Sequence, residues 1–383
     1  MTIPVASATA ESPRLLICFS HLRWDFVHQR PQHLLTRAAR DHRVVYFEEP
    51  LFEAIDNTPR LRLRDDASGV TVATPILPEA ATTDVIRALI DQLIGGLRRT
   101  ELITWYYTPM ALAFSAHLEP DVCVYDCMDE LAAFQNPPPG LRRYEELLFE
   151  RADLVFTGGY SLYEVKRRQH PRVYAFPSSV DAAHFRQARA GRPDPADQCS
   201  VPHPRIGFFG VIDERMDLAL VAHAAAEMPD VEFIMLGPVA KIDPAILPRS
   251  ANLHWLGGKG YGDLPEYLAN WTAGWMPFAL NPATRFISPT KTPEFLAAGL
   301  PLTSTAVPDV LRGYAGNGLV AIADRASIVA TLRASLRPPE PAWLARVDKH
   351  LAAQSWDMTW TAMRDHLRRA RMAPVEVLQR KGA

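Results

Sequence analysis

Short runs of β-branched and aromatic residues alternate with amphipathic stretches from Arg14 onward. Runs such as 15–20 (LLICFS), 44–49 (VVYFEE) and 122–127 (VCVYDC) have the composition and length of buried strands. Between such runs the apolar positions recur every three or four residues, as in 83–99, which predicts helices with one apolar face. Strands that alternate with helices are typical of βαβ units, so we expect a parallel sheet with helices packed against it.

The alternation stops near residue 186 and restarts at residue 205. The stretch between them, 186–204, is rich in proline, glycine and charged residues, which predicts a linker. Runs 205–210 (RIGFFG) and 231–237 (VEFIMLG) then open a second series of predicted strands and helices. The expected fold class is therefore α/β, with two doubly wound domains, residues 1–190 and 205–350, that face each other across a cleft.

Charge, cysteine content and hydropathy narrow the classes of function. The 383-residue chain carries 41 basic and 43 acidic residues, a formal charge of -2, which gives none of the broad positive field that nucleic-acid binding needs. Cys123 and Cys127 are two of four cysteines and lack the spacing of a redox or zinc motif, so we expect reduced thiols. The sequence has neither a signal-peptide pattern nor an 18-residue apolar run, and we expect a cytoplasmic protein with no nucleic-acid partner.

A candidate anion site lies at the start of a predicted helix in the second domain. Ser288, Pro289 and Thr290 precede this helix, which begins near Lys291 and contains Glu294 one turn later. Free backbone amides, hydroxyls and a lysine at a helix start can hold a diphosphate, and the carboxylate can accept two ribose hydroxyls. The alternative is an ordinary capping arrangement with an ion pair between the lysine and the glutamate.

Two glycines of the second domain also follow predicted strands. Gly210 ends the first strand, where a glycine lets a phosphate approach the backbone, although a plain tight turn explains it equally well. Gly257 belongs to the run 256–263 (LGGKGYGD), which lacks the spacing of a dinucleotide-binding fingerprint. We expect the backbone of that loop to border a base.

In the first domain, a loop after the first strand is rich in polar rings. His21, Trp24, His28 and Arg30 lie in the segment 19–35, and such side chains at the carboxyl end of a strand suit hydroxylated or anionic ligands. We expect Trp24, His28 and Arg30 to bind an acceptor and His21 to lie near its reacting group. The alternative is that Trp24 anchors the loop and the histidines are solvated.

Two aspartates are candidates for a general base. Asp126 and Asp129 close or follow the strand 122–127, beside Glu130, and burial of such a carboxyl raises its pKa toward that of a useful base. They are equally explained as caps of the next helix. The sequence has no Asp-x-Asp, His-Glu-x-x-His or Cys/His cluster, so we expect no metal and no other cofactor.

Several segments, in this order along the chain, resemble glycosyltransferases of the GT-B type. They are ADLVFTGGYSLYEVKRR, VYAFPSSVDAAHF, IGFFGVIDERMDLALV, LHWLGGKGYGDLPEYLANWTAGWMPF and SPTKTPEFLAAGLPLTST, and they span about residues 14–310. The SPTKTPEFLAAG block is similar to the nucleotide-binding signature of family 4 members. The opening WDFVHQRPQHLL looks like enzymes that build bacterial surface polysaccharides, and VYDCMDE looks like the xanthan glucuronosyltransferase type.

The resemblance implies two Rossmann-like domains and a metal-independent hexosyltransferase. Its donor would be a nucleoside diphosphate sugar, expected to be a UDP-sugar, and its acceptor a glycan, a lipid-linked sugar or a small molecule. Glu294 would bind the ribose, Lys291 the diphosphate, and Asp129, with Asp126 second, would be the base. The final helices, 351–383, would cross back onto the first domain.

Two positions depart from the family pattern. Phe286 stands where many retaining members have a glutamate, and Asp217 stands where a lysine would complete a pair with Arg215. Arg215 would then contact the diphosphate without that second lysine. Whether the reaction inverts or retains the configuration of the sugar is left open. Two other functions share these features: a nucleotide-sugar epimerase of the same fold, and a non-catalytic subunit that binds a nucleotide-sugar or a glycan.

Three arginine pairs in the first domain suggest contact with a membrane. Arg98–Arg99, Arg142–Arg143 and Arg167–Arg168 would meet anionic lipid if the acceptor were carried on a lipid, and each nearby charge contributes about 1 kcal/mol. Solvated helix faces explain the same pairs. The sequence leaves both alternatives open: peripheral contact of the first domain with the inner face of a membrane, and a solvated surface.

Overall fold

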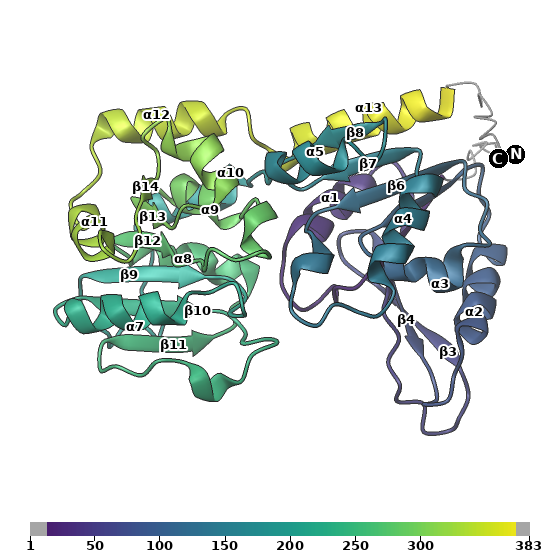
Figure 1. Ribbon diagram of the computed structural model, residues 1–383, viewed down its shortest axis with the longest axis horizontal. Coiled ribbons are helices and arrows are strands. Elements are labelled where there is room, and N and C mark those ends of the chain that lie inside the picture. The colour runs from purple at the N-terminus through teal and green to yellow at the C-terminus, as the bar shows by residue number, and fades with distance from the viewer. Residues whose placement is uncertain (1–13, 373–383) are drawn as a thin grey trace, which may run out of the picture.

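The computed structural model describes residues 14–372, and within them the chain forms two α/β domains that lie side by side (Figure 1). The first domain is built on an eight-stranded sheet of order β3-β4-β2-β1-β5-β6-β7-β8, and the second on a six-stranded sheet of order β11-β10-β9-β12-β13-β14. Every pairing is parallel except that of β3 with β4. The expected fold class, two doubly wound α/β domains, is confirmed. Residues 1–13 of the predicted first domain and 373–383 of the predicted final helices lie outside the described part of the chain.

The strands of the first domain are β1 (Leu15–Ser20), β2 (Arg43–Glu48), β3 (Arg60–Asp65), β4 (Val70–Ile76), β5 (Leu102–Tyr106), β6 (Val122–Cys127), β7 (Leu154–Thr157) and β8 (Val173–Ala175). Those of the second domain are β9 (Arg205–Phe209), β10 (Glu232–Leu236), β11 (Leu253–Gly257), β12 (Ala273–Met276), β13 (Leu302–Ser304) and β14 (Ala321–Ile322).

The α-helices up to the linker are α1 (Arg30–Ala38), α2 (Thr83–Gly95), α3 (Leu112–Ser115), α4 (Leu141–Arg151), α5 (Tyr160–Lys166) and α6 (Ala182–Arg186). Those that follow are α7 (Leu218–Glu227), α8 (Leu264–Ala269), α9 (Lys291–Ala298), α10 (Pro308–Val310), α11 (Ile328–Ser335), α12 (Pro341–Leu351) and α13 (Trp356–Met372). Short 3-10 turns include η1 (Pro109–Ala111), η3 (Gln187–Ala190) and η4 (Pro244–Ile246).

Strand β3 and the pair α5 and β8 were not expected from the pattern. β3 reads RLRLRD and is almost wholly exposed at the sheet edge, so it lacks the apolar run that marks a buried strand. α5 and β8 are short, at seven and three residues. Helix α2 ends at Gly95, four residues before the predicted end, because a glycine pair at 95–96 favours termination there.

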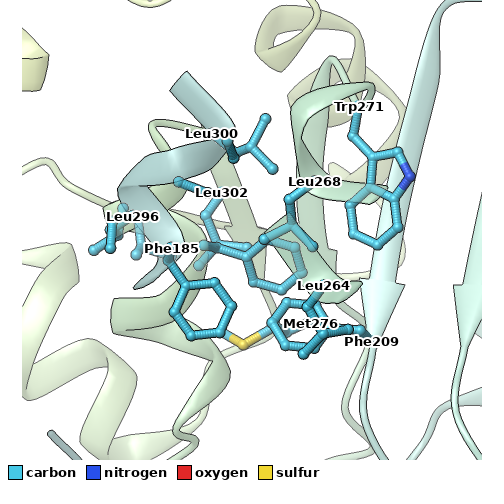
Figure 2. Packing of buried hydrophobic residues seen from close by; sticks show 14 of the residues in the cluster. Phe185, Phe209, Leu264, Leu268, Trp271, Met276, Leu296, Leu300 and Leu302 are labelled. Atoms are coloured by element: carbon cyan, nitrogen blue, oxygen red, sulfur yellow. The ribbon is translucent and has the colours of Figure 1, made fainter. Parts of the chain in front are cut away.

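The segment 180–190 packs into the second domain, whereas the sequence placed it in the first. Phe185 is fully buried beside Phe209 of β9 and Leu296 of α9, and Figure 2 shows these side chains pointing into one cluster with Met276. The predicted linker begins at residue 186, within this segment, but the short helix α6 has an apolar face, and that face packs against α9. The chain therefore enters the second domain's core before the linker.

The last two helices lie on different domains. Val347 and Leu351 of α12 belong to the core of the second domain, whereas Trp356 and Trp360 of α13 are buried in the core of the first. Figure 1 shows α13, in yellow, lying along the first domain close to β7 and β8. The chain crosses between the domains a second time at residues 352–355.

Candidate active site

Two neighbouring cavities lie between the domains, at the carboxyl ends of the strands. The larger has a volume of about 680 Å³ and the smaller about 120 Å³. Val27 of the first domain and Gly210 and Lys291 of the second line both. A ligand that reaches from one cavity to the other would therefore pass Lys291.

Backbone that follows β9, β10 and β11 forms one wall of the larger cavity. Gly210 and Gly237 adopt φ values of +146° and +149°, and a Cβ on Gly237 would lie 1.7 Å from the carbonyl oxygen of Gly210. Only glycine allows the two strand ends to approach this closely, which leaves their backbone open to a ligand. Residues 258–261 line the same wall, and Gly257 (φ +71°) sits at the turn just before them.

Aromatic rings from both domains stack beside this wall. His28 stacks on Tyr261 at 4.3 Å between ring centroids, and Tyr261 stacks on His184 at 4.4 Å. Burial, helped by the nearby Lys291 ammonium, lowers the pKa of His28 to about 4, so its imidazole is neutral.

Trp24 and His28 were expected to bind an acceptor, and the structure places both on the wall of the larger cavity. Trp24 is nearly buried, its ring 4.9 Å from that of Tyr46, as the alternative of a loop anchor required. The opposite wall consists of the glycine-rich strand ends of the second domain, and the acceptor assignment of Trp24 and His28 stays a prediction. The polar rings alone could not reveal which cavity the loop 19–29 would face.

Lys291 and Glu294 share the first turn of α9 and form an ion pair. Lys291 Nζ lies 2.9 Å from Glu294 Oε2 and 4.6 Å from the centroid of the Phe209 ring. Glu294 is 2% exposed and lies behind Lys291, and burial raises its pKa while the ammonium opposes the rise. The ion pair of the alternative explanation is thus present, and the ribose-binding role of Glu294 stays a prediction.

The smaller cavity brings together most of the predicted donor-binding residues and one predicted base. Its lining includes Asp129, Gly210, Arg215, Ser288, Pro289, Thr290 and Lys291. Burial raises the pKa of Asp129, and the Arg215 guanidinium partly offsets this by favouring the carboxylate. Arg215 is held by Asp213, with 2.7 Å between Arg215 Nη2 and Asp213 Oδ2. A carboxyl with a raised pKa therefore faces a fixed cation across this cavity.

Asp126, the second candidate base, and Arg30, a predicted acceptor ligand, form an ion pair with each other, and Arg30 also lines the smaller cavity, so both roles stay predictions. The Arg30 guanidinium donates to both carboxylate oxygens of Asp126 at 2.9–3.1 Å and to the carbonyl of Phe176 at 2.7 Å. Asp126 is fully buried and Arg30 is 3% exposed. Arg30 is also the first residue of α1 and not a loop residue, because Gln29 and Gln32 form a capping box there.

His21 lies apart from both cavities, in a third of about 470 Å³ that also includes Glu49, Phe134 and Lys241. Burial and the nearby Lys241 ammonium lower the pKa of His21 to about 4. Lys241 Nζ lies 5.0 Å from the centroid of the Phe134 ring, and Arg215 lies 5.5 Å from the same centroid. The Phe134 ring therefore contacts both Lys241 of this third cavity, which we call the polar chamber, and Arg215 of the smaller cavity.

Sequence reasoning missed Lys241, Tyr261 and Gly237. All three follow strands of the second domain, so the rule that ligands bind beyond the carboxyl ends of parallel strands could have found them.

Hydrogen bonds hold the two domains together beside these cavities. Ser178 donates through its hydroxyl to the carbonyl of Ser288 at 2.5 Å, and Asp309 accepts from the amide of Ser161 at the start of α5 at 2.9 Å. Ser288 thus links the two domains through its backbone carbonyl, and it also lines the smaller cavity.

Residues 14–372 contain no cluster of three or more histidine, cysteine, aspartate or glutamate side chains arranged to hold a metal ion. Within the same residues, we find no helix with the length and apolar character needed to cross a membrane.

Comparisons with known proteins point to one kind of relative. No family model matches the sequence. The chain is 27% identical over 237 residues, 57% of its length, to TuaH of Bacillus subtilis (strain 168), whose name gives it as a glycosyltransferase of teichuronic acid biosynthesis. The chain spans about 59% of the length of that curated relative.

Solved structures match over nearly the whole chain. Sucrose-phosphate synthase from Thermosynechococcus elongatus has a TM-score of 0.69 at 13% identity, over 93% of this chain and 98% of that one. The Escherichia coli structure titled trehalose-6-phosphate, bound with UDP-2-fluoro glucose, has a TM-score of 0.69 at 11% identity, over 94% and 99%. A UDP-forming α,α-trehalose-phosphate synthase from Burkholderia xenovorans, in complex with glucose-6-phosphate, gives 0.65 at 14%, over 92% and 100%. With two Rossmann-like domains around a cleft and this extent of overlap, the chain has the GT-B fold of the glycosyltransferases.

Proposed function

We propose that this protein is a glycosyltransferase that moves a sugar from a UDP-sugar to a hydroxyl group of an acceptor. The larger cavity would hold the nucleoside, with the base beside residues 258–261. The diphosphate would lie at Lys291, where the larger and smaller cavities join. The transferred sugar would then lie in the smaller cavity, between Arg215 and Asp129.

One observation carries this proposal: a buried carboxyl and two cations line the same small cavity. Asp129 has a pKa raised by burial, which makes it a stronger base toward the hydroxyl of the acceptor. Lys291, Arg215 and the free amides at the start of α9 would stabilise the charge that develops on the leaving diphosphate. The acceptor's oxygen would form the new bond as the bond from the sugar to phosphate breaks, and Asp129 would take its proton.

The cations also support a reaction that uses no metal ion. Lys291 lies at the junction of the cavities, and Arg215 is held in place by Asp213. Together they would supply the positive charge beside the diphosphate that a divalent cation supplies in metal-dependent enzymes. Chelation with EDTA should therefore leave turnover unchanged.

The similar proteins support UDP as the nucleotide of the donor and sugar transfer as the reaction. Two of the solved structures name UDP in their titles, and TuaH is named as a glycosyltransferase. These relatives favour transfer over a nucleotide-sugar epimerase or a non-catalytic binding subunit.

The test is Asp129→Asn, with Asp84→Asn on the exposed surface of α2 as the matched control. Release of UDP from UDP-glucose and UDP-glucuronic acid should fall about 100-fold in Asp129→Asn and stay unchanged in the control. Calorimetry should give the same affinity for UDP in all three proteins, because Asp129 belongs to the first domain, whereas the residues proposed to hold the diphosphate belong to the second. An inverted anomeric product is expected, since a base is needed when the acceptor attacks from the opposite face.

Two results would contradict this function. Near-normal turnover by Asp129→Asn would refute Asp129 as the base and, with it, the proposed mechanism. Failure of wild-type protein to bind UDP would refute the nucleotide site itself. Saturating UDP at about 100 times its dissociation constant should otherwise stabilise the fold by about 2.7 kcal/mol.

A further inference from the structure

An apolar groove continues from the polar chamber across the first domain. The groove has a volume of about 270 Å³, and its lining includes Phe19, Phe47, Phe52, Met110 and Phe114. Glu49, Thr108 and Met110 line both the groove and the chamber, so the two spaces are neighbours. At this junction a polar space that contains His21 and Lys241 becomes an apolar one.

Three of the four polar groups that line the groove have partners within the protein. The hydroxyl of Ser20 accepts from the Tyr46 hydroxyl at 2.7 Å. Glu48 accepts from the Trp24 amide at 2.8 Å and from the Thr74 hydroxyl at 2.7 Å.

The third group is Thr108, whose hydroxyl accepts from the amide of Met110 at 3.3 Å. Glu49 is the fourth, and it lies at the junction with the polar chamber. A hydrocarbon chain forms no hydrogen bonds. It could therefore occupy the groove while these three groups keep the partners they have within the protein.

Apolar side chains are also exposed where the groove opens. Phe52 on its rim is 57% exposed, and Ile55, three residues along the same loop, is 100% exposed. The loop that carries them follows β2 and lies on the first domain, away from the donor wall. The apolar surface thus continues from the groove to the outside of the molecule.

We propose that the acceptor is an amphiphile whose hydrocarbon chain lies in this groove and whose hydroxyl-bearing head lies in the polar chamber. The proposal rests on the proposed function, because it assigns the acceptor side of the same reaction. The head would reach Asp129 past Phe134, and the chain would leave the protein between Phe52 and Ile55. A water-soluble acceptor without a chain would leave the aromatic groove exposed to water.

The chain in the groove should be recognised by its length. Each methylene group that leaves water for the groove is expected to strengthen binding about fourfold, which corresponds to about 0.8 kcal/mol. The dependence should level off once the groove is filled, because further carbons remain in solvent.

The test uses methyl, butyl, hexyl and octyl β-glucosides, each as a monomer in solution, with affinity measured by calorimetry. Affinity for wild-type protein should rise with chain length. Met110→Asn places a polar group at the junction, and Phe52→Ser removes the apolar rim. Both substitutions should lower the affinity for octyl glucoside at least tenfold. Ile246→Ser is the control, since Ile246 is similarly exposed, at 56%, but lies on η4 of the other domain.

Several outcomes would overturn the inference. Affinity that does not depend on chain length, or an equal loss in Ile246→Ser, would show that the groove does not bind the chain. If the wild-type protein binds octyl glucoside but has no affinity for UDP, the proposed function is refuted, and the groove is not an acceptor site. Normal UDP binding and turnover without any dependence on chain length would refute the groove alone.

Discussion

Removal of the Lys291 ammonium tests whether the first turn of α9 serves stability, the ligand, or both. In Lys291→Met the aliphatic part of the side chain is kept, while the carboxylate of Glu294 loses its partner 2.9 Å away. Glu294 is 2% exposed, and loss of one partner from a buried ion pair costs about 3–5 kcal/mol. The free energy of unfolding of Lys291→Met at pH 8 should therefore fall by about that amount.

The loss should depend on pH in a fixed direction. Burial already raises the pKa of Glu294 above its ordinary value of 4.5, and without the ammonium the pKa rises further. A carboxyl whose pKa is higher in the folded chain binds more protons there, so stability falls as the pH rises above the unfolded pKa. Urea denaturation at pH 5, 6, 7 and 8 should show a steeper fall for Lys291→Met than for the wild type.

A second variant separates stability from binding. Lys291→Met with Glu294→Gln removes both charges, so most of the stability should return, whereas affinity for UDP should stay about 10- to 150-fold below that of the wild type. Uridine should bind nearly normally, since it has no diphosphate. Glu294→Gln alone should reduce the preference for ribose over 2′-deoxyribose.

Equal losses for uridine, UMP and UDP would refute this reasoning, because they would mean that the pair only holds the helix together. Unchanged stability of Lys291→Met at pH 8 would show that Glu294 is not a buried, charge-dependent group.

Three further predictions concern the same structure. Asp126→Asn leaves the guanidinium of Arg30 buried without its carboxylate, so urea denaturation should show a loss of about 3–5 kcal/mol, and wild-type stability would contradict the buried pair. Gly237→Ala places a methyl group 1.7 Å from the carbonyl oxygen of Gly210, so it should lower the free energy of unfolding by more than about 1 kcal/mol and lower the affinity for UDP. Thermal shift with and without UDP measures both effects. The exposed arginine pairs of the first domain should carry the protein to the top fraction on flotation with anionic vesicles at low salt, and a protein that stays wholly in the soluble fraction is evidence against membrane contact.

Local sequence patterns were sufficient to predict the buried strands other than β8, and the start of α9. Buried parallel strands such as β1 and β6 are continuous apolar runs, because helices cover both faces of the sheet, and such runs are visible in the sequence. The rule that ligands bind beyond the ends of parallel strands then led to Gly210, Lys291 and Asp129, which line the same cavity.

Contacts between distant segments were beyond that reasoning. Arg30 and Asp126 are 96 residues apart, and their pairing depends on the first residue of α1 reaching the carboxyl end of β6. Each residue alone has the features of a functional group, because a charged residue at a strand end looks the same whether its partner is a ligand or another side chain.

The sequence by itself determined two doubly wound α/β domains and the start of α9 at Lys291, because strand and helix periodicity and terminal residues act over a few positions. The tertiary structure alone decided that the segment 180–190 joins the second domain, that His28 meets Tyr261 across the cleft, and that Lys241 faces the polar chamber. The physical reason is that burial and charge pairing are settled by which surfaces come into contact, and the chain brings together residues whose separation in sequence carries no signal of that contact.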